Sequence, residues 1–185
     1  MDTIDVILSR RSHRQYLKKD VDEKTLNLLL ECGLRASFGG PPKPKCQVTE
    51  FVVIRDSDLK SKLAMTYDDR QFIKESPLLI ACCANTKNDP QYNEWLLSVS
   101  LSIQNIVIAA ESLGLGCCIL SCFINHDAHV HDKQILRNVL KLPEGVELIA
   151  LVSIGYKDES EVLPEKTYRN KEEVIFSNYY DCINE

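Results

Sequence analysis

The chain has 185 residues and a formal net charge of −5, with 44% hydrophobic and 26% charged residues. This length predicts one domain, residues 1–185, large enough to bury a core. The acidic balance argues against a nucleic-acid partner, which requires a broad basic face. No apolar run approaches the ~20 residues that span a membrane, and charges interrupt the N-terminus. We therefore expect a cytoplasmic protein with no membrane partner.

The first elements flank a basic stretch. A short amphipathic helix is predicted at Thr3–Ser9, and Asp22 is a suitable N-cap for a second helix that runs to about Ala36. Arginine forks bind phosphate oxygens in pairs, and a serine hydroxyl between them adds a neutral donor. The stretch Ser9–Tyr16 therefore indicates a site for a small anion, and a solvated surface turn is the alternative. The cations of the stretch and its continuation are Arg10, Arg11, Arg14, Lys18 and Lys19.

A glycine- and proline-rich stretch, Ser37–Pro44, must end the second helix. Gly39 and Gly40 would let the backbone approach a ligand closely, so a binding loop and a simple linker both remain possible. After it come a predicted strand, a helix, and a second strand whose apolar residues do not alternate, which indicates that it is covered on both faces. These elements are predicted at Glu50–Ile54, Asp58–Met65 and Leu78–Ala84.

The second half of the chain carries the longest predicted helix, at about residues 93–113, and Gly114 is its expected C-terminal stop. Apolar residues on several of its faces predict a central, largely buried helix. Alternation of helices with apolar strands predicts an α/β or α+β fold. The sequence lacks a Gly-x-Gly-x-x-Gly turn between a strand and a helix, which argues against a Rossmann dinucleotide site. The later elements are predicted at Cys117–Phe123, Lys133–Leu140 and Glu147–Ile154, followed by a polar tail.

Eight cysteines and a histidine-rich stretch raise the question of a metal. The cysteines form no Cys-x-x-Cys pair, and most lie in apolar runs, so we expect packed thiols rather than zinc ligands. The histidines precede a predicted helix, where a polar capping loop is expected in any case. We therefore predict no metal site, with a metal at the histidines as the alternative. These residues are His126, Asp127, His129 and His131.

Over nearly its whole length the chain resembles the nitroreductase family of flavin oxidoreductases. The opening resembles the family's Arg-Arg-Ser-x-Arg-x-aromatic motif, and the central helix with its exit resembles the family's Gly-Leu-Gly-x-Cys. Similar blocks follow in the same order. The matching stretches are Arg10–Tyr16, Leu34–Gln47, Gln71–Ala84, Gln104–Cys117, Leu142–Tyr156 and Arg169.

The resemblance implies an α+β nitroreductase-like fold with a mixed, mostly antiparallel sheet flanked by helices. It implies an intertwined homodimer with one FMN per subunit at the interface, and NAD(P)H as hydride donor. Arg10, Ser12 and Arg169, with Arg11 in the same stretch, would bind the FMN phosphate. Arg14 and Gln71 would face the pyrimidine edge of the flavin. Packed near the ring would be Ser37, Phe38, Gly39 and Gly40 of the partner subunit, and along its other side Leu120, Ser121 and Cys122.

The implied function is hydride transfer from NAD(P)H through FMN to nitroaromatic, quinone or related small-molecule acceptors by a ping-pong mechanism. A cation near the ring raises the flavin potential. No residue can be assigned as a catalytic acid or base. The loop Lys45–Thr49 departs from the family's Asn-x-Gln-Pro-Trp and keeps only Gln47, which leaves the flavin contact of this loop open. The alternatives are a flavin-binding protein of the same fold with a specialised or non-catalytic role, and a metal-dependent or ligand-binding α/β domain.

Overall fold

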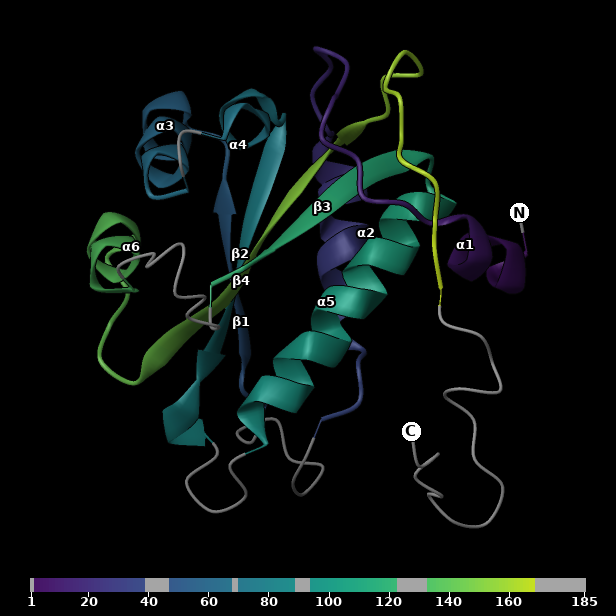
Figure 1. The fold of residues 1–185 in the computed structure, drawn as a ribbon. Helices are drawn as coiled ribbons and strands as arrows, with labels where there is room; N and C mark the ends of the chain where they lie inside the picture. The colour runs from purple at the N-terminus through teal and green to yellow at the C-terminus, as the bar shows by residue number, and fades with distance from the viewer. Residues whose placement is uncertain (1, 39–46, 68–69, 89–93, 123–132, 169–185) are drawn as a thin grey trace, which may run out of the picture.

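The computed structural model describes residues 2–38, 47–67, 70–88, 94–122 and 133–168 (Figure 1). It is an α+β protein in which one sheet has helices on both faces. The helices are α1 (Thr3–Ser9), α2 (Glu23–Leu34), α3 (Ser57–Met65), α4 (Gln71–Glu75), η2 (Thr86–Asn88, 3₁₀), α5 (Trp95–Ser112) and α6 (Lys133–Leu140). The strands are β1 (Thr49–Ile54), β2 (Leu78–Asn85), β3 (Leu115–Ser121) and β4 (Val146–Tyr156).

The four strands pair antiparallel in the order β1-β2-β4-β3. The described part also contains a parallel pairing, the isolated bridge between Ser12 and Cys117 at the outer edge of β3. The two central strands are buried almost end to end, which confirms that Leu78–Ala84 is covered on both faces. Figure 1 shows α2 and α5 on one face of the sheet and α3, α4 and α6 on the other.

Each face of the sheet has its own hydrophobic core. On the α2 and α5 side, side chains of α5 such as Val99 and Ile106 pack against alternate residues of the strands, among them Cys117. On the α3, α4 and α6 side, Leu63 and Phe72 pack against the intervening residues, among them Cys118. Because successive strand residues point to opposite faces, neighbours in β3 belong to different cores.

Local capping chemistry explains where several elements begin and end. Asp22 accepts a hydrogen bond from the amide of Thr25 at 2.8 Å, as expected for the N-cap of α2. Gly114 has φ +75°, a left-handed conformation that glycine adopts without a Cβ clash, and it separates α5 from β3. The predicted helices Thr3–Ser9 and Lys133–Leu140 have the observed bounds.

Three sequence expectations need correction. Helix α2 ends at Leu34, two residues before the predicted Ala36. The five-residue helix α4 lies in a stretch for which no element was predicted. Helix α5 is long and apolar enough to cross a membrane by length and composition, but it packs in the core on one face only. On the face that the described residues leave uncovered, Leu97 is 57% and Leu101 is 39% exposed, so the helix is less buried than expected.

Candidate functional site

The basic stretch crosses the end of the sheet that is formed by β3 and β4. The amide of His13 donates to the carbonyl of Cys117 at 2.9 Å, and the amide of Leu17 donates to the carbonyl of Tyr156 at 3.0 Å. Two glycines make this close passage possible. A Cβ on Gly116 would lie 2.7 Å from Cβ of His13, and a Cβ on Gly155 would lie 2.9 Å from Cβ of Tyr16.

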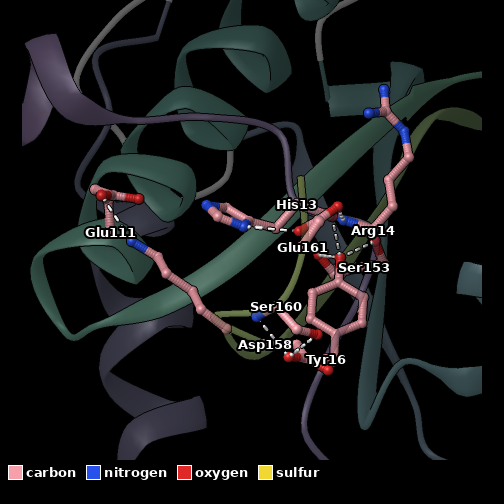
Figure 2. Close-up of polar contacts among 9 residues, drawn as sticks. His13, Arg14, Tyr16, Glu111, Ser153, Asp158, Ser160 and Glu161 are labelled. Atoms are coloured by element: carbon pink, nitrogen blue, oxygen red, sulfur yellow. Dashed lines mark hydrogen bonds and ion pairs between the residues drawn. The ribbon is translucent and has the colours of Figure 1, made fainter. Parts of the chain in front are cut away.

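Tyr16 fixes the far end of this crossing. Its hydroxyl donates to the carbonyl oxygen of His13 at 2.6 Å and lies 2.7 Å from Oγ of Ser153 in β4 (Figure 2). Burial raises the pKa of Tyr16 well above the ordinary value of a phenol, so the group stays protonated at neutral pH. Tyr16 therefore acts as a neutral anchor for the segment.

The segment that carries the predicted cofactor arginines lies along the edge strand β3. Arg10 is the C-cap of α1, and Ser12 forms the isolated bridge to Cys117. Burial raises the pKa of the Cys117 and Cys118 thiols, whose side chains belong to opposite cores. The positive charge of Arg10 partly counteracts this rise at Cys117, and that of Arg14 does so at Cys118.

Around Arg14 the structure gathers residues from the start of α4. The Arg14 guanidinium lies 5.9 Å from the ring centroid of Phe72. Burial raises the pKa of the Cys118 thiol, and the charges of Arg14 and Arg70 both oppose this rise. Gln71, between them in sequence, donates through Nε2 to Oε1 of Glu75 at 2.8 Å. The predicted pair of Arg14 and Gln71 is therefore brought to one corner of the molecule, and Arg70 and Phe72 are additional residues that the sequence reasoning did not select.

The arginines of the basic segment and of the start of α4 differ from other arginines in their pairing. Within the described ranges, no carboxylate forms an ion pair with the side chain of any of them, whereas Arg35, Arg55 and Arg137 each pair with a glutamate. Cations that lack counter-charges among the described residues of an acidic protein favour an anionic ligand. The four residues concerned are Arg10, Arg11, Arg14 and Arg70.

The residues predicted along the other side of the ring divide between the two faces of the sheet region. Leu120 and Cys122 are buried in the core on the α3 and α6 side. Ser121 is exposed and lines a groove of about 320 Å³ between α5 and β3, together with Gln104. Their three side chains therefore do not share one surface, and their contact with a flavin stays a prediction.

The cysteines of the described strands are buried free thiols. Burial raises the pKa of Cys83 and of Cys117 to about 12 and that of Cys122 to about 11. The Cys122 Sγ also lies 2.6 Å from the hydroxyl of Tyr67 inside the core. Since the thiolate is the reactive form, these cysteines are packed as inert apolar groups, as the sequence predicts.

Several predicted residues lie at or beyond the limits of the described chain. Ser37 and Phe38 follow α2 directly, with Ser37 exposed and Phe38 half-buried. Gln47 donates through Nε2 to the carbonyl of Leu34 at 3.0 Å. In the part of the chain that the structure describes, no group of three histidines, cysteines or carboxylates is placed to hold a metal. The residues outside the described ranges are Gly39, Gly40, His126, Asp127, His129, His131 and Arg169.

A further contact of the crossing segment was not visible in the sequence. His13 Nδ1 lies 2.9 Å from Oε2 of Glu161, a residue of the segment that follows β4 (Figure 2). The two residues are 148 positions apart, and neither has a local pattern that predicts the other. Arg70, by contrast, adjoins the selected Gln71, so its positive charge in that stretch was a usable signal.

Comparison with known proteins identifies the family. The family model described as the Nitroreductase family matches residues 7–71 and 65–156, so the chain belongs to the nitroreductase family. A protein of Archaeoglobus fulgidus with the provisional name NADH dehydrogenase/NAD(P)H nitroreductase is 26% identical over 92% of this chain and 98% of its own. The NADPH-flavin oxidoreductase of Vibrio harveyi is 24% identical over 99% of this chain and 76% of its own.

Solved structures agree with this assignment. The FMN-dependent nitroreductase of Clostridium difficile R20291 is similar to this chain with a TM-score of 0.77 and 25% identity, covering 95% of this chain and 99% of its own. The fold class predicted from the sequence, a nitroreductase-like α+β fold, is confirmed. The described sheet contains the antiparallel pairs expected of it.

Proposed function

We propose that this protein is an FMN-dependent oxidoreductase that takes hydride from NAD(P)H and passes it to a nitroaromatic, quinone or related small-molecule acceptor by a ping-pong mechanism. The observation that carries the proposal is the cluster of arginines at the edge of β3, which lacks acidic partners among the described residues. Membership of the nitroreductase family and the relatives named for flavin or FMN chemistry support the same assignment.

The residues present fit FMN. A phosphate requires several cationic or neutral donors, and the segment offers Arg10, Arg11 and the Ser12 hydroxyl within three consecutive positions. The isoalloxazine ring requires an apolar wall with polar groups at its pyrimidine edge, and Arg14 beside Phe72, with Gln71 next to it, offers this combination. The donor set is thus cationic at one end and mixed at the other, as a phosphorylated aromatic ligand requires.

The mechanism assigns binding and orientation to the protein. Arg10 and Ser12, together with Arg169, would hold the phosphate, and Arg14 and Gln71 would hold the pyrimidine edge. When bound, FMN supplies two-electron transfer between the nicotinamide and the acceptor. The positive charge of Arg14 favours the more negative state of a group held beside it, because opposite charges attract more strongly where water is excluded. No side-chain nucleophile is required by this scheme.

The test begins with the purified wild-type protein, which should bind FMN and oxidise NAD(P)H with an artificial acceptor. Arg10→Ala should weaken FMN binding by roughly ten- to a hundred-fold, since one charge-assisted contact is lost. Arg35→Ala is the matched control, because the Arg35 guanidinium already pairs with Glu31 at 2.9 Å. FMN binding without NAD(P)H oxidation would favour the non-catalytic alternative. Absence of FMN binding by the wild type would reject the proposal itself.

We also propose that the active protein is a cytoplasmic homodimer with two composite sites. The described chain leaves large apolar side chains exposed on two helices, α1 and α5: Ile4 is 63%, Leu8 is 69% and Leu97 is 57% exposed. Apolar side chains with this exposure on two helices support burial against a second subunit. In a twofold dimer, each site would combine the arginines of one subunit with Gly39 and Gly40 of the partner subunit.

Complementation tests this arrangement. One variant loses Arg10 and Arg14, and the other carries bulky residues at Gly39 and Gly40, so each alone should be inactive. After the two are unfolded, mixed equally and refolded, half of the dimers should be mixed, each with one intact site. We therefore expect roughly a quarter of the wild-type activity. Demonstrated mixed dimers with no recovered activity would show that each site belongs to a single chain.

A further inference from the structure

The carboxylate of Glu161, which lies outside the arginine stretch, binds two consecutive residues of that stretch. Glu161 Oε2 lies 2.9 Å from Nδ1 of His13, and Glu161 Oε1 accepts from the backbone amide of Arg14 at 2.8 Å (Figure 2). The side chains of His13 and Glu161 are only 9% and 8% exposed. A carboxylate in such a position requires partners, because burying an unpaired charge is costly. Both of its oxygens are satisfied by the segment that crosses the sheet.

The chain after β4 is folded so that Glu161 reaches this place. Oδ1 of Asp158 accepts from both the amide and the hydroxyl of Ser160, at 2.9 and 2.7 Å, and the amide of Glu161 donates to the carbonyl of Asp158 at 3.1 Å. The two hydrogen bonds from Ser160 also hold the pKa of the Asp158 carboxyl below its ordinary value. The turn reverses the chain directly after the bridge between Tyr16 and Lys157. Glu161 is therefore delivered by a built turn and not by a free tail.

The contact with Glu161 sets which ring nitrogen of His13 carries a proton. An ionised carboxylate only accepts hydrogen bonds, so Nδ1 of His13 carries the proton and donates to Glu161. The backbone of His13 is held from the other side by the carbonyl of Cys117 at 2.9 Å. Between these two contacts, the peptide unit that leads into Arg14 has little freedom to rotate. The direction in which the Arg14 side chain leaves the segment is fixed as a result.

Arg14 is the residue for which this direction matters. Its guanidinium lies 5.9 Å from the ring centroid of Phe72, the residue next to Gln71 at the start of α4. We propose that Glu161 is a positioning residue for the cofactor site: through His13 Nδ1 and the Arg14 amide, it fixes the Arg14 guanidinium toward the pyrimidine edge of the flavin. This inference rests on the proposed function.

Three variants test the inference. Glu161→Ala should bind FMN roughly ten- to a hundred-fold more weakly, which corresponds to losing one charged hydrogen-bond partner of the segment. Glu161→Gln keeps the shape and one acceptor oxygen, and should give an intermediate affinity. Glu165→Gln is the control, since Glu165 is an exposed glutamate and, like Glu161, belongs to the chain that follows β4. Thermal melting of each variant separates loss of affinity from loss of the fold.

The midpoint potential of bound FMN provides a readout that a merely structural role would not change. A displaced Arg14 charge should weaken binding of the reduced, more negative cofactor several-fold more than binding of the oxidised cofactor, which lowers the potential. If the folded Glu161→Ala and Glu161→Gln variants match the wild type in both FMN affinity and midpoint potential, this inference is wrong and the proposed function still stands. A wild-type protein that binds no FMN would overturn the proposed function and this inference with it.

Discussion

Replacing Gly116 by alanine tests whether the arginine segment must lie directly on the sheet. The new Cβ would lie 2.7 Å from Cβ and 2.9 Å from Cγ of His13, well inside ordinary contact distance. Both strand and segment are held by backbone hydrogen bonds, so the segment must be pushed away from β3 by several tenths of an ångström. Overpacking of this kind costs about 1–3 kcal/mol.

The size of the protein converts this cost into measurable shifts. For a chain of this length, about 1 kcal/mol lowers the melting temperature by about 2–4 °C, so Gly116→Ala should melt about 2–12 °C below the wild type. The displaced segment carries Ser12 and Arg14, so FMN affinity measured by fluorescence quenching should fall roughly tenfold, equivalent to about 1.4 kcal/mol.

Gly114→Ala is the matched control two residues away. A Cβ there would meet nothing within 4 Å, but φ of +75° makes alanine strained by about 1–2 kcal/mol. This variant should therefore lose stability and keep its FMN affinity. If Gly116→Ala melts within 1 °C of the wild type and binds FMN equally well, the close passage of His13 over β3 is not what organises the site.

Three further outcomes are expected. The free energy of unfolding should fall above about pH 8.5. Burial raises the pKa of Cys83, Cys117 and Cys122 to about 12, 12 and 11 in the folded chain, whereas thiols of the unfolded chain have pKa values near 8.5. Above about pH 8.5 the unfolded chain therefore loses protons that the folded chain keeps, which favours unfolding. At pH 9.5 the loss is about 1.4 kcal/mol per thiol, measured by urea unfolding in a reductant, and a flat profile would contradict the burial of these groups. Alkylation of the folded enzyme should leave turnover intact, whereas rapid stoichiometric inactivation with substrate protection would show that Cys122 is misassigned. Exhaustive chelation should also leave turnover intact, and its loss and return with added metal would favour a metal at His126 and His129.

Elements with local stop and start signals were predictable from the sequence. Asp22 and Gly114 mark helix ends through their own side chain or backbone, so their elements were placed to within two residues. Helix α4 was missed because five residues are too short for a helical period, and its N-cap residue Arg70 makes no side-chain cap hydrogen bond.

The candidate site was predictable where its residues are clustered in sequence. The charges of Arg10, Arg11 and Arg14 stand out in an acidic chain, and the corner that includes Gln71 followed from the family resemblance. Glu161 could not be selected, because its role arises from a contact across 148 positions that only the folded chain creates. The division of Leu120 and Ser121 between two surfaces, by contrast, follows from strand alternation once both are placed in the predicted strand Cys117–Phe123, and the resemblance had grouped them on one side of the ring.

The joining of the first and last described segments has a consequence for biosynthesis. His13 leaves the ribosome early, but Glu161 follows 148 residues later, and Lys166, whose Nζ donates to the carbonyl of Leu8 at 3.0 Å, comes later still. At translation rates of about 5–20 residues per second, the basic segment waits roughly 7–30 s for these contacts. Nascent chains stalled before residue 161 should therefore retain FMN poorly, and cofactor loading becomes one of the last steps in the maturation of the chain.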